Sequence, residues 1–177
     1  MVQSIIEIYE YDKEWEEIFS SLKEVVIHSL GHLILDIEHV GSTAVPGLGA
    51  KPILDIDVVI QDHDVLPDVI QELEILGYHH QPEWSFEGRE AFGRKDLLTP
   101  WDGSKTEWMD HHLYVCNKES EELSRHIAFR NYLRNNRAAV MKYDKLKRTL
   151  AKEMNNRAAY TSGKTEFINK VLEKTKG

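Results

Sequence analysis

Residues 53–60 read ILDIDVVI, and this run constrains the fold more than any other part of the chain. Aliphatic and β-branched residues dominate it, as is typical of a strand buried inside a sheet. Asp55 and Asp57 interrupt it two positions apart, and side chains alternate faces along a strand. Both carboxylates therefore share one face, where they repel each other unless a cation lies between them or one holds a proton. Two solvated charges on an edge strand are the alternative, but the apolar neighbours favour a central strand.

A loop rich in glycine and proline, residues 41–52, comes before the acidic run. The apolar pattern of residues 33–40 predicts a strand ahead of this loop, and pairing of the two strands would bring Ser42 close to Asp55. Gly41 and Ser42 offer backbone N–H groups and a hydroxyl, which suit a phosphate. The stretch thus predicts half of a metal and phosphate site.

Two side chains beside this loop are further candidates. Lys51 lies at its far end and is able to reach a phosphate or to neutralise Asp55, although a lone lysine is more often a surface charge. His39 lies two residues before Gly41 and is expected to line the same cleft. A hydrogen-bonded core histidine is the alternative for His39, and the sequence leaves both open.

The rest of the chain reads first as strands and then as helices. Helices are predicted over residues 12–31, 62–77, 119–135, 138–154 and 164–174, and further strands over residues 78–86, 89–97 and 111–117. With 177 residues the chain fits one domain, with a sheet portion over about residues 1–117 and a helical portion over about residues 118–177. The predicted fold class is α+β, a small mixed β-sheet with flanking helices and a helical C-terminal region.

The composition narrows the class of protein. At 41% hydrophobic and 29% charged residues, it is that of an ordinary soluble globular protein. The first residues are acidic, and no apolar run approaches the roughly 20 residues of a membrane span, so we expect neither a signal peptide nor a membrane partner. Cys116 is the single cysteine, which excludes an internal disulfide and disfavours a zinc site built on thiolates. A cytoplasmic location is the default expectation.

The net charge of −8 hides an asymmetry along the chain. Residues 1–117 hold 7 Lys and Arg against 23 Asp and Glu, a balance of −16, whereas residues 118–177 hold 15 against 7, a balance of +8. The acidic total disfavours a duplex nucleic acid as partner. The basic C-terminal portion either neutralises the acidic portion or supplies cations to a phosphorylated ligand, and the former needs no function.

Two later segments bear on the same cleft. In the predicted strand 111–117, His112 and Tyr114 share one face, because they are two positions apart. In the helix that follows, His126, Arg130, Arg134 and Arg137 fall on one stripe. Arginine binds phosphate through a planar fork, so this stripe is a second candidate phosphate site. A solvated basic face is the alternative.

The string EHVGSTAVPGLGAKPILDI resembles the signature of the GrpB-like family of the nucleotidyltransferase superfamily. The pieces YDKEWEEIF, FGRK, HLYV, AFRNYLR and AYTSGKTEFI agree with that family in the same order, so the resemblance covers nearly the whole chain. It implies a nucleotidyltransferase-like fold. In that fold Gly41 and Ser42 would hold the nucleotide phosphates, and Asp55 and Asp57 would be the catalytic acids that bind divalent ions.

The same resemblance extends the predicted site. Arg130 in AFRNYLR, Lys164 in SGKTEF and Arg94 in FGRK are assigned to phosphate or nucleotide binding, together with Lys51. Related enzymes use a third carboxylate from a later strand, and this chain has His112 and Tyr114 there. We therefore expect His112 as a third metal ligand and Tyr114 as a residue that lines the cleft.

Three functions are compatible with these residues. The first is a nucleotidyltransferase that uses Mg²⁺ or Mn²⁺ to transfer a nucleotidyl or phosphoryl group to a small acceptor. The second is a catalytically reduced protein that binds a nucleotide or phosphorylated metabolite as a sensor. The third is a metal-dependent hydrolase that uses His112. The sequence leaves the acceptor, the base preference and the oligomeric state open.

Overall fold

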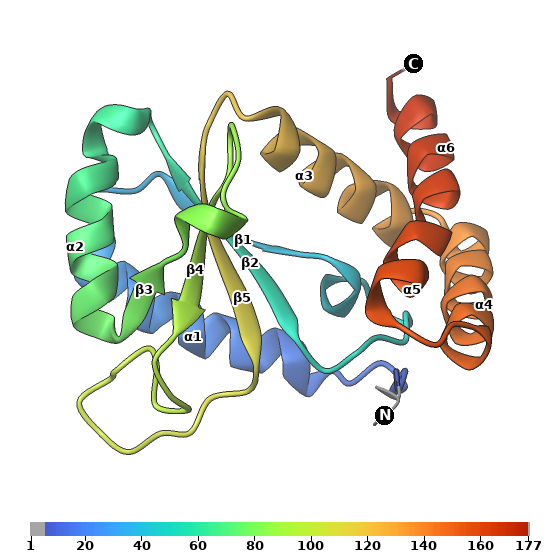
Figure 1. Cartoon of the computed structure of the whole chain (residues 1–177), viewed down its shortest axis with the longest axis horizontal. Coiled ribbons are helices and arrows are strands. Elements are labelled where there is room, and N and C mark those ends of the chain that lie inside the picture. The colour runs from blue at the N-terminus through green and yellow to red at the C-terminus, as the bar shows by residue number, and fades with distance from the viewer. Residues whose placement is uncertain (1–5, 177) are drawn as a thin grey trace.

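The structure is a computed structural model that describes residues 6–176. Within these residues a five-stranded mixed sheet forms the centre, with the strand order β1-β2-β5-β4-β3 (Figure 1). The strands are β1 (Asp36–Val40), β2 (Leu54–Ile60), β3 (Tyr78–His80), β4 (Glu90–Arg94) and β5 (His111–Asn117). Strand β2 runs antiparallel to β1 and parallel to β5, so both of its edges are hydrogen-bonded. The acidic run is thus an interior strand, as its apolar character predicts.

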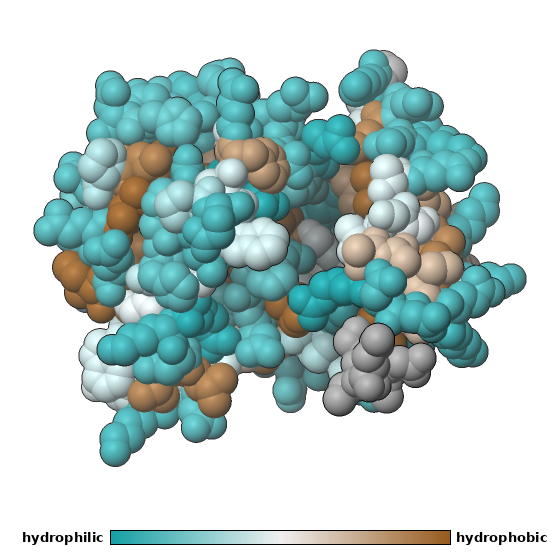
Figure 2. Space-filling view, viewed as in Figure 1, coloured by the Kyte–Doolittle hydropathy of each residue, from teal (hydrophilic) through white to brown (hydrophobic). Residues whose placement is uncertain are grey.

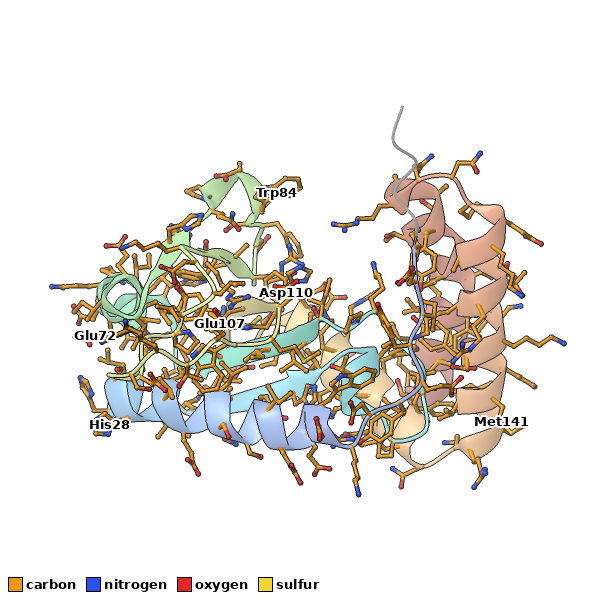
Figure 3. The ribbon with its side chains drawn as sticks, turned by 90° about the horizontal axis from the view of Figure 1, so that it is seen from below. His28, Glu72, Trp84, Glu107, Asp110 and Met141 are labelled. Atoms are coloured by element: carbon orange, nitrogen blue, oxygen red, sulfur yellow. The ribbon has the colours of Figure 1, made fainter. Side chains whose placement is uncertain are left out.

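The helices divide between the two faces of the sheet. Helices α1 (Glu14–Leu30) and α2 (Leu66–Leu76) pack on one face. Helix α3 (Glu121–Arg134) contacts β1 and β5 from the other face, and α4 (Arg137–Glu153), α5 (Arg157–Gly163) and α6 (Thr165–Thr175) pack beside it. Short 3₁₀ turns are η1 (Ser42–Ala44), η2 (His63–Val65) and η3 (Pro82–Trp84). Seen from below, the sheet with α1 forms one half of the molecule and α4, α5 and α6 the other (Figure 3).

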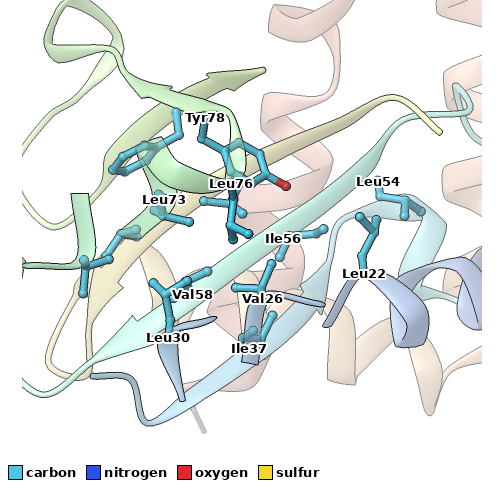
Figure 4. Close-up of a cluster of buried hydrophobic side chains, with 14 of the residues drawn as sticks. Leu22, Val26, Leu30, Ile37, Leu54, Ile56, Val58, Leu73, Leu76 and Tyr78 are labelled. Carbon is cyan, nitrogen blue, oxygen red and sulfur yellow. The ribbon is translucent and has the colours of Figure 1, made fainter. Parts of the chain in front are cut away.

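The main core lies between the sheet and α1 and α2. Helix α1 buries Trp15, Leu22, Val26 and Leu30, whose spacings of seven, four and four residues place them on one side of a helix. They pack against alternate residues of the strands. Figure 4 shows this cluster and labels Leu22, Val26, Leu30, Ile37, Leu54, Ile56, Val58, Leu73, Leu76 and Tyr78. Each fully buried aliphatic side chain contributes roughly 1.5–3 kcal/mol. This core holds one face of β2 and leaves the acidic face to the other side.

A second cluster joins the loop after β1 to the C-terminal helices. Val45 and Leu48 of the loop are buried against Leu133, Val140 and Tyr143 of α3 and α4. The ring of Phe167 in α6 stacks on that of Tyr143, with 4.8 Å between the ring centroids. The loop is therefore packed between the sheet and the helices.

The predicted helices and strands are present. Helix α5 is an additional element, because the sequence pattern predicts a break at the Thr-Ser-Gly of residues 161–163 and no helix there. Asn156 caps this helix, since its side chain accepts a hydrogen bond from the N–H of Ala159. The strands predicted over residues 78–86 and 89–97 are shorter than expected, because Pro82 begins η3 and only Phe86 and Arg89 pair across the turn. The α+β fold class is confirmed.

None of the helices between residues 6 and 176 combines the length and the apolarity needed to cross a bilayer.

Candidate functional site

The acidic face of β2 is the floor of the candidate site. In the β2–β5 register Asp55 lies opposite His112, and Asp57 lies opposite Tyr114. On the other side, Glu38 of β1 lies opposite Asp57. Residues that face each other across neighbouring strands project from the same side of the sheet. The floor therefore gathers three acids, an imidazole and a phenol, and the predicted shared face of Asp55 and Asp57 is confirmed.

Asp57 is held in the interior by a histidine. Its side chain is 0% exposed, and its Oδ2 lies 2.6 Å from Nδ1 of His126 in α3. Nε2 of His126 lies 3.0 Å from Oε1 of Glu122. Burial alone would lower the pKa of His126, but the hydrogen bond and the charges of the two acids together raise it. The other oxygen of Asp57, Oδ1, is buried and has no hydrogen-bond partner among residues 6–176.

Arg130 has a different role from the one predicted. Its guanidinium is buried, and Nη1 donates to Oε2 of Glu38 at 2.5 Å and to the carbonyl oxygen of His39 at 3.0 Å. The residue thus balances the third acid of the floor and fixes the end of β1. We correct the prediction that it binds phosphate, because the guanidinium is buried and its Nη1 already donates to Glu38 and to the backbone of β1.

The turn after β1 requires glycine. Gly41 has φ +77° and ψ −175°, a conformation that essentially only glycine adopts. A Cβ at this position would also collide with Oδ2 of Asp55. The backbone of the turn therefore lies directly against the first acid, and the prediction that the loop brings Ser42 close to Asp55 is confirmed.

Three lysines converge above this turn. We call the cavity of about 130 Å³ that they line the lysine pocket, and its walls are Ser42, Thr43, Ala50, Lys51, Ile53, Asp55, His112, Lys147, Tyr160 and Lys164. The ammonium nitrogens of Lys51 and Lys164 lie 5.1 and 4.7 Å from the ring centroid of Tyr160. Burial, followed by the charge of Lys51, lowers the pKa of Lys164 to about 8. Burial also lowers the pKa of Lys51. The structure thus brings Ser42, Lys51 and Lys164 together in one pocket, as expected, and their binding of a phosphate or nucleotide stays a prediction.

The sequence prediction did not include Lys147, although a signal for it exists. On α4 it follows Val140 and Tyr143 at spacings of three and four and precedes Leu150 by three, so it lies on the buried side of the helix. It is 2% exposed, and its Nζ donates to the carbonyl oxygen of Gly49. Burial lowers its pKa to about 7. A lysine on an apolar helix face is the feature that identifies it.

Replacement of Lys147 by methionine should stabilise the fold, and more at pH 6 than at pH 10. The unfolded chain binds a proton at this lysine up to a pKa near 10.5, whereas the folded protein releases it at about 7. The penalty of burying the amine is therefore full below pH 7 and vanishes as the pH rises to 10.5. We expect a gain on the order of 1–3 kcal/mol at pH 6, after the loss of the hydrogen bond to Gly49. Urea unfolding at both pH values measures it.

The matched control for this substitution is Lys145→Met, on the exposed side of the same helix. Its effect on the free energy of unfolding should be close to zero and independent of pH. An equal change for Lys147→Met at both pH values would contradict the low pKa.

A larger cavity adjoins the lysine pocket at Ile53 and His112. We call it the large cavity. It measures about 540 Å³, and its walls are Ile53, Gln81, Trp84, Arg89, Ala91, Phe92, Gly93, Arg94, Asp110, His111, His112, Tyr114 and Arg157. Tyr114 lies in the wall of this cavity and not in that of the lysine pocket. Figure 2 shows the hollow between the two halves of the molecule into which this side of the sheet opens.

Two further residues of the predicted site, His39 and Arg94, do not have the predicted position or role. His39 points to the α1 face, where it stacks on Phe19 at 4.6 Å between ring centroids and its Nε2 lies 2.9 Å from Oγ1 of Thr43. The reason is the register: Val40, and not His39, lies opposite Asp55. Burial lowers the pKa of His39 to about 4. The prediction that His39 lines the cleft is wrong, and the core alternative holds.

Arg94 borders the large cavity, but its guanidinium holds the loop between β4 and β5. Nη1 pairs with Asp110 at 3.2 Å, and the other nitrogens donate to the carbonyl oxygens of Leu97, Thr99 and Trp108. All of its nitrogens are thus engaged within the protein. The predicted phosphate-binding role of Arg94 is wrong for this reason.

The predicted metal ligands are close but not assembled. Nδ1 of His112 lies 3.2 Å from Oδ1 of Asp55. Across residues 6–176, however, no three His, Cys, Asp or Glu side chains are arranged to hold a metal ion by themselves. Any ion at Asp55 and Asp57 would therefore need ligands from water or substrate.

Comparisons with known proteins agree on one family. The sequence profile described as "GrpB protein" matches residues 5–174. The chain is 33% identical over 173 residues to a UPF0157 protein of Halalkalibacterium halodurans, covering 96% of this chain and 82% of that one. It is 31% identical over 164 residues to the glutamate-rich protein GrpB of Alkalihalophilus pseudofirmus, covering 92% and 91%.

Solved structures agree as well. The crystal structure of the conserved protein GrpB from Enterococcus faecalis superposes with a TM-score of 0.79 at 30% identity, and the match covers 96% of both chains. The Cid1 poly(U) polymerase with Mg 3′-dATP bound matches with a TM-score of 0.54 at 14% identity, over 88% of this chain and 49% of that one. This second likeness shows a shared fold, that of the nucleotidyltransferases.

Proposed function

Because the chain belongs to the GrpB family and has a nucleotidyltransferase-type fold, we propose that it binds a nucleoside triphosphate and transfers the nucleotidyl group to a small acceptor. One observation carries this proposal. Lys51, Lys147 and Lys164 line the same small pocket as Ser42 and Asp55. Several cations together with an acid in one pocket are what a polyphosphate with a divalent ion requires.

The three lysines are matched to a polyphosphate rather than to a single weak anion. Each is at least half-buried, and Asp55 is the one acid in the pocket wall. Burial, followed by the charges of neighbouring cations, lowers the pKa values of all three lysines, that of Lys147 to about 7. A bound polyanion would restore their protons, because it supplies the negative charge that the empty pocket lacks. Arg130 and Arg94 are not part of this grip.

A divalent cation fits beside this pocket. Asp57 has a buried oxygen without a hydrogen-bond partner in the described part of the chain, and Asp55 is part of the pocket wall. Mg²⁺ and Mn²⁺ prefer such oxygen ligands, and Mg²⁺ keeps several waters, so two carboxylates with phosphate oxygens suffice for one ion. Asp55 and Asp57 would hold it, with His112 beside them, and it would neutralise charge on the phosphates.

The proposed reaction is an in-line displacement at the α-phosphorus. The hydroxyl oxygen of the acceptor forms a bond to this phosphorus, and the bond to the oxygen that bridges to the β-phosphorus breaks. Pyrophosphate leaves with the electron pair, and the lysines stabilise its charge. The proton of the hydroxyl passes to His112, whose imidazole is 53% exposed where the two cavities meet.

Nucleotide binding is tested by titration of ATP, GTP, CTP and UTP with MgCl₂ or MnCl₂ in a calorimeter. We expect Lys164→Met to weaken the nucleotide that binds best by at least about tenfold, because one buried charge-assisted contact is lost. The control is Lys174→Met, which changes an exposed lysine of α6. Equal affinities for the wild type and Lys164→Met would refute the proposed phosphate pocket.

A binding protein without turnover is the second candidate, and the ion pairs of the floor favour it. Asp57 is hydrogen-bonded to His126, and Glu38 is paired with Arg130, so this floor is less open to metal than three free acids. Incubation of α-labelled nucleotide with a pool of small metabolites separates the two functions. Label on a new compound, with pyrophosphate released, supports transfer, whereas saturable binding with no product supports the sensor.

A further inference from the structure

The large cavity takes no part in the proposed phosphate binding, and it is large enough to hold a second ligand. At about 540 Å³ it is within the range of pockets that hold small organic ligands. It touches the lysine pocket at His112 and extends away from it over β4 and β5. Figure 3 shows two of its residues, Trp84 and Asp110, on the edge of the sheet half that faces the C-terminal helices.

Arg89 is the most unusual group in this cavity. Its guanidinium carbon lies 4.3 Å from the ring centroid of Phe86 and 4.2 Å from that of Tyr114, so two aromatic rings fix it. Nη2 donates to the carbonyl oxygen of Trp84 at 3.0 Å. Nε is buried and has no hydrogen-bond partner within residues 6–176, and no carboxylate there forms an ion pair with this arginine. Its positive charge is thus held in place without an internal counterion.

Arg157 adds a second cation, which comes from the C-terminal helices. It is the first residue of α5 and is exposed, and it lines the large cavity together with Arg89. Asp110 is the one acid in the wall, and it already pairs with Arg94. The cavity therefore carries a net positive charge that an anionic group on a ligand would balance.

Aromatic side chains also line the large cavity and could contact a ligand there. Trp84 is 65% exposed at the cavity wall, although a tryptophan side chain is usually well buried. Tyr114 presents its ring from β5 between Arg89 and the acidic floor. Flat rings at such positions stack on flat ligands.

We propose that the large cavity is the acceptor site and takes a small molecule with an aromatic ring, an anionic group and a hydroxyl. This inference rests on the proposed nucleotidyl transfer. The anionic group, a carboxylate or a phosphate, binds between Arg89 and Arg157, and the ring stacks beside Trp84. The hydroxyl then points to His112, where the lysine pocket begins. A long polyanion is disfavoured, because residues 1–117, which build most of the wall, carry a balance of −16.

The test measures binding of simple probes in the absence of nucleotide, so it does not depend on the lysine pocket. Saturation-transfer NMR titrations compare 4-hydroxybenzoate, 4-hydroxyphenyl phosphate, 4-hydroxybenzamide and 4-hydroxycyclohexanecarboxylate. We expect an anionic aromatic probe to bind at least about tenfold more tightly than the neutral amide and than the non-aromatic acid. The stronger of the carboxylate and the phosphate identifies the anionic group.

Variants assign the binding to this cavity. Arg89→Met and Arg157→Met should each weaken the best probe by about tenfold, and Trp84→Ala should weaken it as well. Arg125→Met, on the exposed face of α3, is the control and should leave the affinity unchanged. Arg157 is exposed at a helix start, so its replacement tests the site even if Arg89→Met, which removes a packed side chain, fails to fold.

Three results would overturn the assignment. They are equal binding of the acid and the amide, unchanged affinity in Arg157→Met, and tighter binding of hexauridylate than of any small probe. The last would identify the end of an RNA chain as the occupant. If no nucleotide binds in calorimetry, the proposed nucleotidyl transfer is refuted, but the affinities of these probes are not affected. The two proposals can therefore be refuted independently.

Discussion

Asp55→Asn is expected to lower nucleotidyl transfer by at least about 100-fold while it leaves the fold intact. The carboxylate lies between the lysine pocket, the glycine turn and His112, so its charge acts where phosphate and cation would meet. The asparagine side chain has almost the same size, and Asp55 is 36% exposed, so the free energy of unfolding should change little. Release of pyrophosphate from the nucleotide that binds best measures the rate.

The control for this variant is Asp36→Asn, which removes an exposed acid of β1 on the neighbouring strand. It should retain the full rate. Equal rates for Asp55→Asn and the wild type would exclude a catalytic role for the acidic pair. Loss of nucleotide affinity with no measurable turnover in either protein would instead support the sensor.

Gly41→Ala is expected to destabilise the protein by about 2–4 kcal/mol and to abolish nucleotide binding. Alanine at this position must adopt a backbone conformation that is costly for any residue with a Cβ. It must also displace the carboxylate of Asp55 that the Cβ would meet. Urea unfolding and calorimetric titration measure the two effects.

The chain provides a matched control in the same loop. Gly47 has φ +83°, but a Cβ there would meet no atom within 4 Å. Gly47→Ala therefore carries backbone strain without a collision, and the difference between the two variants isolates the contact with Asp55. If both variants lost the same stability and both kept the nucleotide, the close approach of the turn to Asp55 would have no functional meaning.

The sequence pattern predicted the floor of the site, because the alternation of side chains between the two faces of a strand depends only on that strand. It placed Asp55 with Asp57, and His112 with Tyr114, without knowledge of the partners. It failed for His39, because the face of that residue relative to Asp55 depends on the register between two strands. A shift of one residue in that register exchanges the faces, and the turn that sets the register has a conformation that only glycine allows.

The walls of the site were harder to predict because they depend on how distant segments pack. Lys147 is 98 residues from the Gly49 carbonyl that it contacts, and Glu38 is 92 residues from Arg130. No sequence rule for a single helix states which strand its polar residue will meet. Of the two alternatives that the charge asymmetry left open, neutralisation of an acid is seen at Arg130, whereas the supply of cations to a ligand stays a proposal. Lys147 and Lys164 line the pocket in which that ligand is proposed to bind.

The loop between β1 and β2 contacts both the sheet and the C-terminal helices. Val45 and Leu48 pack among the helices, the N–H of Gly49 donates to Asp144 at 2.8 Å, and Gly41 lies against the first acid. A tilt of the helices against the sheet would therefore strain this loop, which also contains the turn proposed to bind phosphate. A ligand that contacts both the sheet and the helices would restrain the loop from both ends. Phosphate binding at the proposed turn would then be coupled to the width of the cleft.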